Sequence, residues 1–250
     1  MKKSVTISLK VKRSVMACIC LTFVTLATAQ TSNVGTWNIA DLYYKLNSHY
    51  TLWMEVQTRS QNIYSDFFYH QYKGGLFYNF PNSHNSIFFG GGRYTTYNYS
   101  GNFKSPVTTD EFRIWEQLIL NNVYSHFNVE HRYRLEQRWV NNVFRPCLRY
   151  RLNPTYPINH STIVPKTLFV SAYDEIFIGN NNPHFERNRY YLGMGYQFSF
   201  LFTLQMGLIN QTDFNAKGGQ TDKNYIQTTL MFSTSKKVNK KDNRNSSIME

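Results

Sequence analysis

Residues 127–140, FNVEHRYRLEQRWV, alternate between two kinds of side chain. Asn128 to Arg138 are polar or charged at every second position. The other positions are mostly large and apolar, with two polar interruptions: Phe127, Val129, His131, Tyr133, Leu135, Gln137 and Trp139. Successive side chains of a β-strand point to opposite faces of the sheet. A strand over these residues would therefore have one aromatic and aliphatic face and one strongly ionic face.

Three further segments alternate in the same way: 51–59 (TLWMEVQTR), 144–153 (FRPCLRYRLN) and 187–200 (RNRYYLGMGYQFSF). After residue 29, no segment is long and apolar enough to cross a bilayer as a helix, which takes about 20 residues. A sheet that crosses a bilayer must close on itself, because hydrocarbon cannot pair with free backbone groups. Its outer face is then apolar and its lumen polar. We therefore predict an all-β fold, an antiparallel transmembrane β-barrel with the tryptophans (Trp37, Trp53, Trp115, Trp139) in aromatic girdles.

Alternation recurs in eleven blocks, at 36–46, 50–60, 67–79, 86–97, 110–123, 126–140, 143–153, 166–179, 186–199, 202–212 and 224–234. Bacterial single-chain barrels normally have an even number of strands. We therefore predict 10 or 12 strands, with the first block partly outside the wall or two strands merged in one block. Block 67–79 shows no clean alternation.

The connections between these blocks differ in length. Short turns at 47–49, 122–125 and 199–202 alternate with longer connections at 97–110, 179–186 and 212–224. We expect the short turns in the periplasm and the longer connections outside the cell. The connection 153–166 is long where a short turn is expected.

The N-terminus has the three parts of a secretory signal peptide. Residues 1–13 carry five basic residues and no acid, an apolar run follows, and Ala27-Thr28-Ala29 forms a cleavage site. The alternative, a membrane anchor helix, needs a longer apolar run. We therefore predict a cleaved signal peptide over 1–29, a barrel over 30–235 and a basic disordered tail over 236–250, with export to the outer membrane of a Gram-negative cell. Cleavage would leave Cys147 as the single cysteine, so no internal disulfide is expected.

The positive charge lies mostly at the two ends of the chain. The whole sequence carries +12, of which the predicted signal peptide holds five bases and the tail five bases against two acids. The excess on the barrel is therefore small, which argues against nucleic-acid binding. Outer-membrane lipids, lipopolysaccharide and the barrel-assembly machinery are the expected partners.

The polar parity of the strands predicts the residues that line the lumen: Glu55, Arg59, Glu130, Arg132, Arg134, Glu136, Arg138, Arg145, Arg149, Arg151, Glu175 and Arg189. Arginine pairs well with carboxylates, so a lumen filled by Arg–Glu networks is one interpretation. The other is a narrow pathway for small solutes, because rings of basic side chains favour anions. A barrel of this size has little free interior, and porins with open channels use 16 or more strands, which favours a mostly filled lumen.

Catalytic and cofactor sites are not predicted. The alternative function, a membrane-embedded lipid-modifying hydrolase, would need a serine near a histidine base. His131 has lipid-facing parity, but positions 129 and 133 hold no serine. A hydrogen bond from His131 to a headgroup or to a cross-strand partner is the simpler interpretation. The seven histidines have no metal-ligand spacing, and residues 88–94 (FFGGGRY) lack the ending of a phosphate loop.

Five segments together resemble a known family: EFRIWEQL, VEHRYRLEQRW, FRPCLRYRLN, VSAYDEIFIG and ERNRYYLGMGYQF. The matching pieces are His131-Arg132, Arg149-x-Arg151, Glu175 and Arg187/Arg189. The family is an uncharacterised group of outer-membrane β-barrels, domain of unknown function 2490, and the similarity covers nearly all of 37–234. It implies an outer-membrane location and transfers no catalytic residue.

Overall fold

A computed structural model describes residues 34–99, 102–104 and 106–235, and in this part of the chain all regular structure is β-strand. The strands are β1 (Val34–Lys45), β2 (Tyr50–Asn62), β3 (Ser65–Asn79), β4 (Ser86–Tyr97), β5 (Val107–Tyr124), β6 (Phe127–Val140), β7 (Val143–Phe144), β8 (Cys147–Pro157), β9 (Thr167–Gly179), β10 (Phe185–Gln197), β11 (Phe202–Phe214) and β12 (Gln220–Ser235). Among these residues, no helix is long and apolar enough to span a membrane. The predicted signal peptide and basic tail lie outside the described residues.

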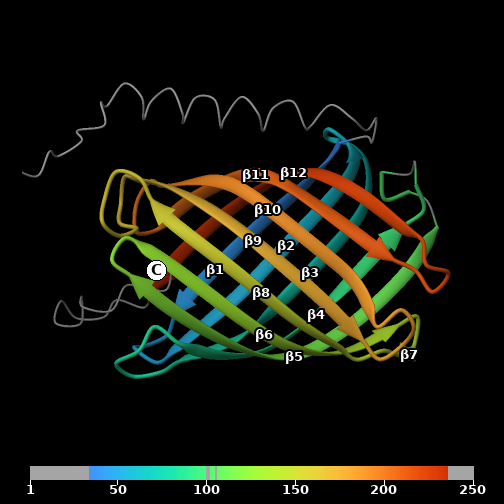
Figure 1. Ribbon diagram of the computed structural model, residues 1–250, viewed down its shortest axis with the longest axis horizontal. Helices are drawn as coiled ribbons and strands as arrows, with labels where there is room; N and C mark the ends of the chain where they lie inside the picture. Colours follow the sequence, from blue (N-terminus) through green and yellow to red (C-terminus); the bar gives the residue numbers. More distant parts are fainter. Residues whose placement is uncertain (1–33, 100–101, 105, 236–250) are drawn as a thin grey trace, which may run out of the picture. The chain divides into compact units, whose positions relative to one another are not determined.

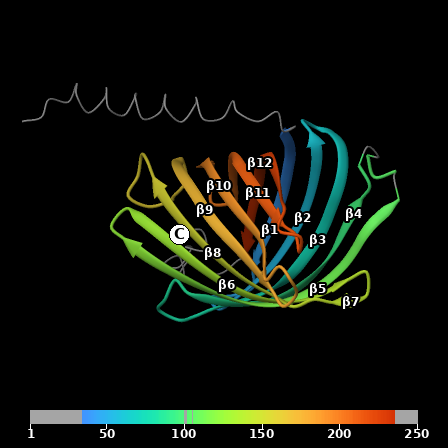
Figure 2. The same ribbon diagram turned by 45° about the vertical axis from the view of Figure 1, so that its right-hand side comes forward.

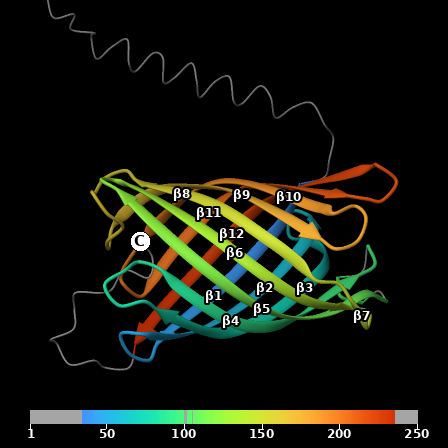
Figure 3. The ribbon, with the colours of Figure 1, turned by 60° about the horizontal axis from the view of Figure 1, so that its bottom comes forward.

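The sheet closes into a barrel whose wall contains eleven of these strands (Figures 1 and 2). Each wall strand pairs antiparallel with its sequence neighbour, and β5–β6 pairing makes the order continuous. The short β7 only extends the hairpin after β6. The ring is completed where β1 and β12 run parallel, from Val34 opposite Asn224 to Lys45 opposite Ser235. Figure 3 shows these two strands side by side, β1 in blue and β12 in red.

The predicted even number of strands is wrong, although the eleven blocks correspond to the eleven wall strands. A chain that reverses direction at every turn ends antiparallel to its first strand only when the count is even. With eleven wall strands, the first and last run in the same direction and must pair as a parallel ladder. The first block lies within the wall as β1. As a result, Val34 and Ser235 lie at opposite ends of the barrel.

The strand order places the predicted short turns at one end of the barrel and the predicted longer connections at the other, but the alternation does not hold for the whole wall: the short turn 63–64 lies at the end where β1 begins, and the longer connection 80–85 lies at the end where β12 finishes. Connections 98–106, 180–184 and 215–219 lie at the barrel end where β1 begins. Turns 46–49, 125–126 and 198–201 lie at the end where β12 finishes, and so does the long connection 158–166. Asn159 anchors this connection, because its Nδ2 donates to the Lys166 carbonyl and its Oδ1 accepts from the Leu168 amide.

The alternation along β2 is confirmed as an inward and an outward face. Met54 is 57% exposed, whereas its neighbour Glu55 is only 8% exposed. Large apolar side chains point outward from the other wall strands as well, among them Tyr72, Phe89, Phe112, Leu118, Tyr133, Leu135, Leu148, Ile178, Tyr190, Leu192, Leu208 and Phe232. The outer surface of the barrel is therefore extensively apolar.

Strand β3 explains why the block 67–79 shows no clean alternation. Gln71 is buried inside while Tyr72 is exposed outside, so the two faces are distinct. Aromatic residues stand on both faces, however, which hides the pattern in the sequence. Gly75 points inward, and the space that its missing Cβ leaves is filled by the Phe88 ring from β4.

Three of the four tryptophans were wrongly assigned to outer girdles. Trp37, Trp53 and Trp115 are buried in the barrel interior. Two of them have an interior acceptor for the indole N–H: Trp37 Nε1 donates to Gln57 at 2.8 Å, and Trp53 Nε1 donates to Asp41 at 2.9 Å. The charged side chains of the interior also lie over tryptophan rings, as described below.

The ionic lumen as a candidate functional site

A cavity of about 520 Å³ lies inside the barrel and is lined by residues of all eleven wall strands. Ten lysine or arginine side chains and five aspartate or glutamate side chains line it. The lining residues include Tyr99 and Lys223 toward the end where β1 begins, and Asn128 and Ile163 toward the opposite end. The long connection 158–166 thus contributes Ile163 to the cavity wall. The interior is polar and basic on balance.

Glu136 on β6 is the centre of a buried ionic network. Its side chain is fully buried and lies 3.2 Å from Arg113 Nη1, 3.3 Å from Arg134 Nη1 and 2.5 Å from Arg149 Nη1. Arg113 pairs in addition with Glu111 through Nε and Nη2, at 2.8 and 2.7 Å. Neighbouring strands β5, β6 and β8 place these inward-facing positions next to one another. Glu136 thus pairs with three guanidinium groups, two of which also contact a second carboxylate.

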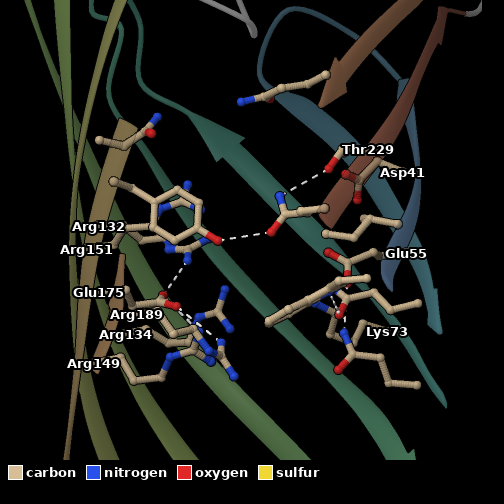
Figure 4. A pocket seen from close by; sticks show the side chains of 18 of the residues that line it. Asp41, Glu55, Lys73, Arg132, Arg134, Arg149, Arg151, Glu175, Arg189 and Thr229 are labelled. Atoms are coloured by element: carbon tan, nitrogen blue, oxygen red, sulfur yellow. Dashed lines mark hydrogen bonds and ion pairs between the residues drawn. The ribbon is translucent and has the colours of Figure 1, made fainter. Parts of the chain in front are cut away.

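Glu175 on β9 is the second hub. Arg132 donates to it at 2.6 Å, Arg149 at 2.8 Å and Arg189 at 3.4 Å (Figure 4). Arg149 contacts both hubs, so Glu136 and Glu175 belong to one network. Arg151 pairs with Glu130 at 2.6 Å. Figure 4 shows that the labelled arginines lie around Glu175 on one side of the lumen.

Aromatic rings also stabilise the buried guanidinium groups, whose charge the carboxylates do not fully neutralise. The guanidinium carbon of Arg149 lies 4.2 Å from the centroid of Phe177, and that of Arg189 lies 4.6 Å from the same ring. Arg113 lies 4.0 Å from the Tyr94 ring. The negative face of an aromatic ring attracts a cation, most strongly where water is excluded. Arginine–aromatic contacts therefore compensate part of the cost of holding so many cations inside.

The opposite wall carries a smaller acidic cluster. Glu55 on β2 forms an ion pair with Lys73 on β3 and accepts a 2.8 Å hydrogen bond from Gln71. Asp41 on β1 lies directly opposite Glu55 in the sheet register. Figure 4 shows Asp41, Glu55 and Lys73 facing the arginine-rich wall across the lumen. The lumen thus has a basic wall from β5 to β10 and a more acidic wall from β1 to β3.

The twelve predicted lumen residues fall into three groups. Nine line the cavity: Glu55, Arg59, Glu130, Arg132, Arg134, Arg149, Arg151, Glu175 and Arg189. Glu136 and Arg138 are buried but do not line the cavity, and Arg138 pairs with Glu186 at 2.7 Å. Arg145 does not contribute and is exposed.

Arg145 was misplaced because block 143–153 is two strands rather than one. Pro146 has no backbone N–H and cannot continue a ladder, and it separates β7 from β8. The backbone of Arg145 instead closes the hairpin: its N–H donates to the Arg138 carbonyl at 2.7 Å, and its carbonyl accepts from Arg138 Nε at 2.9 Å.

Several charged lining residues were not predicted from the sequence: Asp41, Lys73, Glu111, Arg113, Arg187 and Lys223. Glu111 and Arg113 share the inward parity of Trp115 in the block 110–123, so the alternation applied there would have found them. Lys73 lay in the block whose alternation is masked by aromatics on both faces. Arg187 shares the parity of Arg189 in the alternating segment 187–200, so it could have been found in the same way. Asp41 and Lys223 have no comparable signal in the sequence.

His131 lies on the outer face of β6, as its parity predicts. Its Nδ1 is 2.8 Å from the hydroxyl of Tyr150 on β8, the cross-strand kind of partner expected for it. Among the described residues, no group of three or more His, Cys, Asp or Glu side chains is arranged to hold a metal ion.

The fold and the lumen define a class: a closed, mixed β-barrel with an apolar outer surface and an ionic, arginine-rich interior. Within this class, the chain belongs to the family described as "Protein of unknown function (DUF2490)", whose model matches residues 34–222. The match extends from β1 into β12 and so includes nearly the whole wall. A search of the curated proteins found no significant match.

Proposed function

We propose that this protein is an integral outer-membrane β-barrel whose lumen is a narrow, anion-biased pathway for small solutes. The observation that carries the proposal is the twofold excess of basic over acidic side chains along the cavity. Rings of basic side chains lower the energy of an anion inside a pore and raise that of a cation. The signal peptide predicted from the sequence supports export, and outer-membrane lipids, lipopolysaccharide and the assembly machinery would be the partners.

The outer surface supports a position in the membrane. Leu52, Met54 and Val56 are each more than two-fifths exposed, and similar side chains cover the other wall strands. Soluble monomers rarely expose contiguous apolar patches of more than a few hundred Å². Closure of the wall also leaves no unpaired sheet edge between β1 and β12, which is what a sheet needs in hydrocarbon.

The pathway would be narrow, because side chains bridge the interior. Tyr173 from β9 donates to Gln227 Oε1 on β12 at 3.2 Å, and Gln227 Nε2 donates to Thr229 at 3.3 Å (Figure 4). The Arg–Glu network fills further space. The alternative is a purely structural barrel with a plugged lumen. A conductance measurement distinguishes it from the proposed pathway.

Planar bilayers containing the purified protein are expected to show discrete, small, anion-biased conductance. The variant Lys223→Glu reverses a charge at the cavity wall near one mouth. A change of two charges about 8 Å from a permeating ion in water raises the energy of an anion by about 1 kcal/mol and lowers that of a cation by the same amount, which together predict about a thirtyfold fall in the anion-to-cation permeability ratio. Lys104→Glu is the control, because Lys104 is exposed in the connection after β4 and does not line the cavity. Silent membranes, or cation preference in the wild type, would refute the pathway.

The proposal includes no enzymatic step. His131, the candidate base of the alternative lipid-modifying hydrolase, has its Nδ1 within hydrogen-bonding distance of Tyr150. This geometry gives the hydrolase no support, because a base for a serine nucleophile would have to reach a serine hydroxyl.

A further inference from the structure

Arg59, near the end of β2, differs from the other lumen arginines in its surroundings. It is only 7% exposed and lines the cavity. The sheet register places Trp37 of β1 opposite it on one side and Tyr69 of β3 on the other. Its guanidinium carbon lies 3.4 Å from the Trp37 ring centroid and 4.2 Å from the Tyr69 ring centroid. The guanidinium is therefore held between two aromatic rings.

Two glutamines fix these rings. Trp37 Nε1 donates to Gln57 at 2.8 Å, and the Tyr69 hydroxyl donates to Gln71 at 2.5 Å. All four of these side chains point into the lumen from β1, β2 and β3. The position of Arg59 is thus set by packing against its neighbours rather than by a carboxylate.

Within the described part of the chain, the Arg59 charge has no carboxylate partner, and its buried Nε has no hydrogen-bond partner. Arg132, Arg149 and Arg189, by contrast, all reach Glu175. A buried polar group without a partner costs free energy, and a buried charge costs more. The ring contacts compensate some of this cost but leave the Nε–H without an acceptor.

A second cation lies beside the same tryptophan. The guanidinium carbon of Arg189 is 4.9 Å from the Trp37 ring centroid. Its hydrogen bonds go to Gln211 at 2.9 Å and to Glu175 at 3.4 Å, and Glu175 is already shared with two other arginines. Two guanidinium groups therefore lie beside Trp37, and of these only Arg189 pairs with a carboxylate, which it shares with two other arginines.

We propose that Arg59, assisted by Arg189, is a binding site for a small oxyanion inside the lumen. The aromatic rings lie against Arg59 on both sides, and the Arg59 side chain lines the cavity. A guanidinium edge presents parallel donors whose spacing suits two oxygens of a phosphate, sulfate or carboxylate. The site rests on the proposed function, since it would be the point where a permeating anion is held most strongly.

Isothermal titration calorimetry with inorganic phosphate, at constant ionic strength in chloride, tests the site on the refolded barrel. We expect saturable one-site binding, weakened at least tenfold in Arg59→Gln. Arg59→Lys should also bind more weakly, because an ammonium keeps the charge but lacks the planar fork. Arg93→Gln is the matched control, since the Arg93 side chain is 69% exposed and pairs with Asp110 on the outer face. A parallel titration with acetate reports whether a carboxylate competes for the same site.

The fluorescence of Trp37 gives a second measurement. It tests the site even if the Arg59 variants fail to fold. The Trp37 ring contacts Arg59, so phosphate should change its fluorescence, and the change should disappear in Trp37→Phe. Absence of saturable binding to the wild type, an unchanged dissociation constant in Arg59→Gln, or a fluorescence change that persists in Trp37→Phe would overturn the site. Silent bilayers together with phosphate binding at Arg59 would refute the pathway and leave the site standing. Anion-biased conductance without phosphate binding at Arg59 would refute the site and leave the pathway standing.

Discussion

Replacing Glu136 with glutamine should destabilise the barrel by about 3–5 kcal/mol, the range typical for removing one partner of a buried ion pair. Glutamine nearly preserves the shape but removes the negative charge. Arg113, Arg134 and Arg149 would then face one another around a neutral side chain. Because Glu136 is fully buried, water cannot take over the role of the carboxylate.

Urea unfolding of the protein in lipid vesicles, followed by tryptophan fluorescence, measures this effect. The control is Asp110→Asn, which removes a carboxylate from an exposed pair with Arg93. Exposed pairs contribute about 1 kcal/mol or less, so this variant should unfold almost like the wild type. Equal stability of Glu136→Gln and Asp110→Asn would show that the central network does not hold the barrel together.

The second large effect is a covalent link across the parallel β1–β12 seam. Ala40 lies opposite Leu230 in the register, and the alternation places both on the outer face. Cysteines introduced at these two positions, with Cys147→Ser to remove the native thiol, should form a disulfide under mild oxidation, because paired strand positions fall within disulfide reach. The link closes nearly the whole chain into a loop, so the heat-denatured band should migrate differently on a gel until a reductant is added.

The paired control moves one cysteine along β12. Ile226 lies opposite Thr36, four residues from Ala40, or about 13 Å along the strand. The pair Ala40→Cys with Ile226→Cys should therefore stay largely reduced. An efficient link in this pair and none between 40 and 230 would indicate a different register or a different closure of the wall.

Much of the wall could be predicted because strand alternation is a local property. Each inward Glu or Arg of β6 is followed directly by an outward residue, so parity alone separates the two faces. Glu136 and Arg134 were placed inside by this argument, and the structure buries both. The alternation fails as a signal in β3, where Tyr69 and Tyr72 are aromatic residues on opposite faces.

A closed barrel was predicted, but the parallel pairing of β1 with β12 was not, because the even strand number usual in bacterial barrels was preferred to the eleven blocks counted in the sequence. No local sequence feature of β1 or β12 indicates that the two strands pair in parallel. Interior tryptophans are a similar case: an aromatic residue suits either a membrane interface or a guanidinium partner. Trp37 belongs inside only because Arg59 and Gln57 lie next to it in the folded sheet. The hubs at Glu136 and Glu175 likewise appear only when several strands are assembled.

The orientation of the two wall faces is tested most directly by a fluorescent label moved along β2 in vesicles that contain brominated lipids, in the Cys147→Ser background. Labels at 52, 54 and 56 should be strongly quenched, because Leu52, Met54 and Val56 point outward. Labels at 53 and 57 should be quenched little, because Trp53 and Gln57 point into the lumen. Quenching with a period of two residues would support a wall that is apolar toward lipid and ionic toward its axis. Equal quenching at all five positions, or none at any, would contradict it.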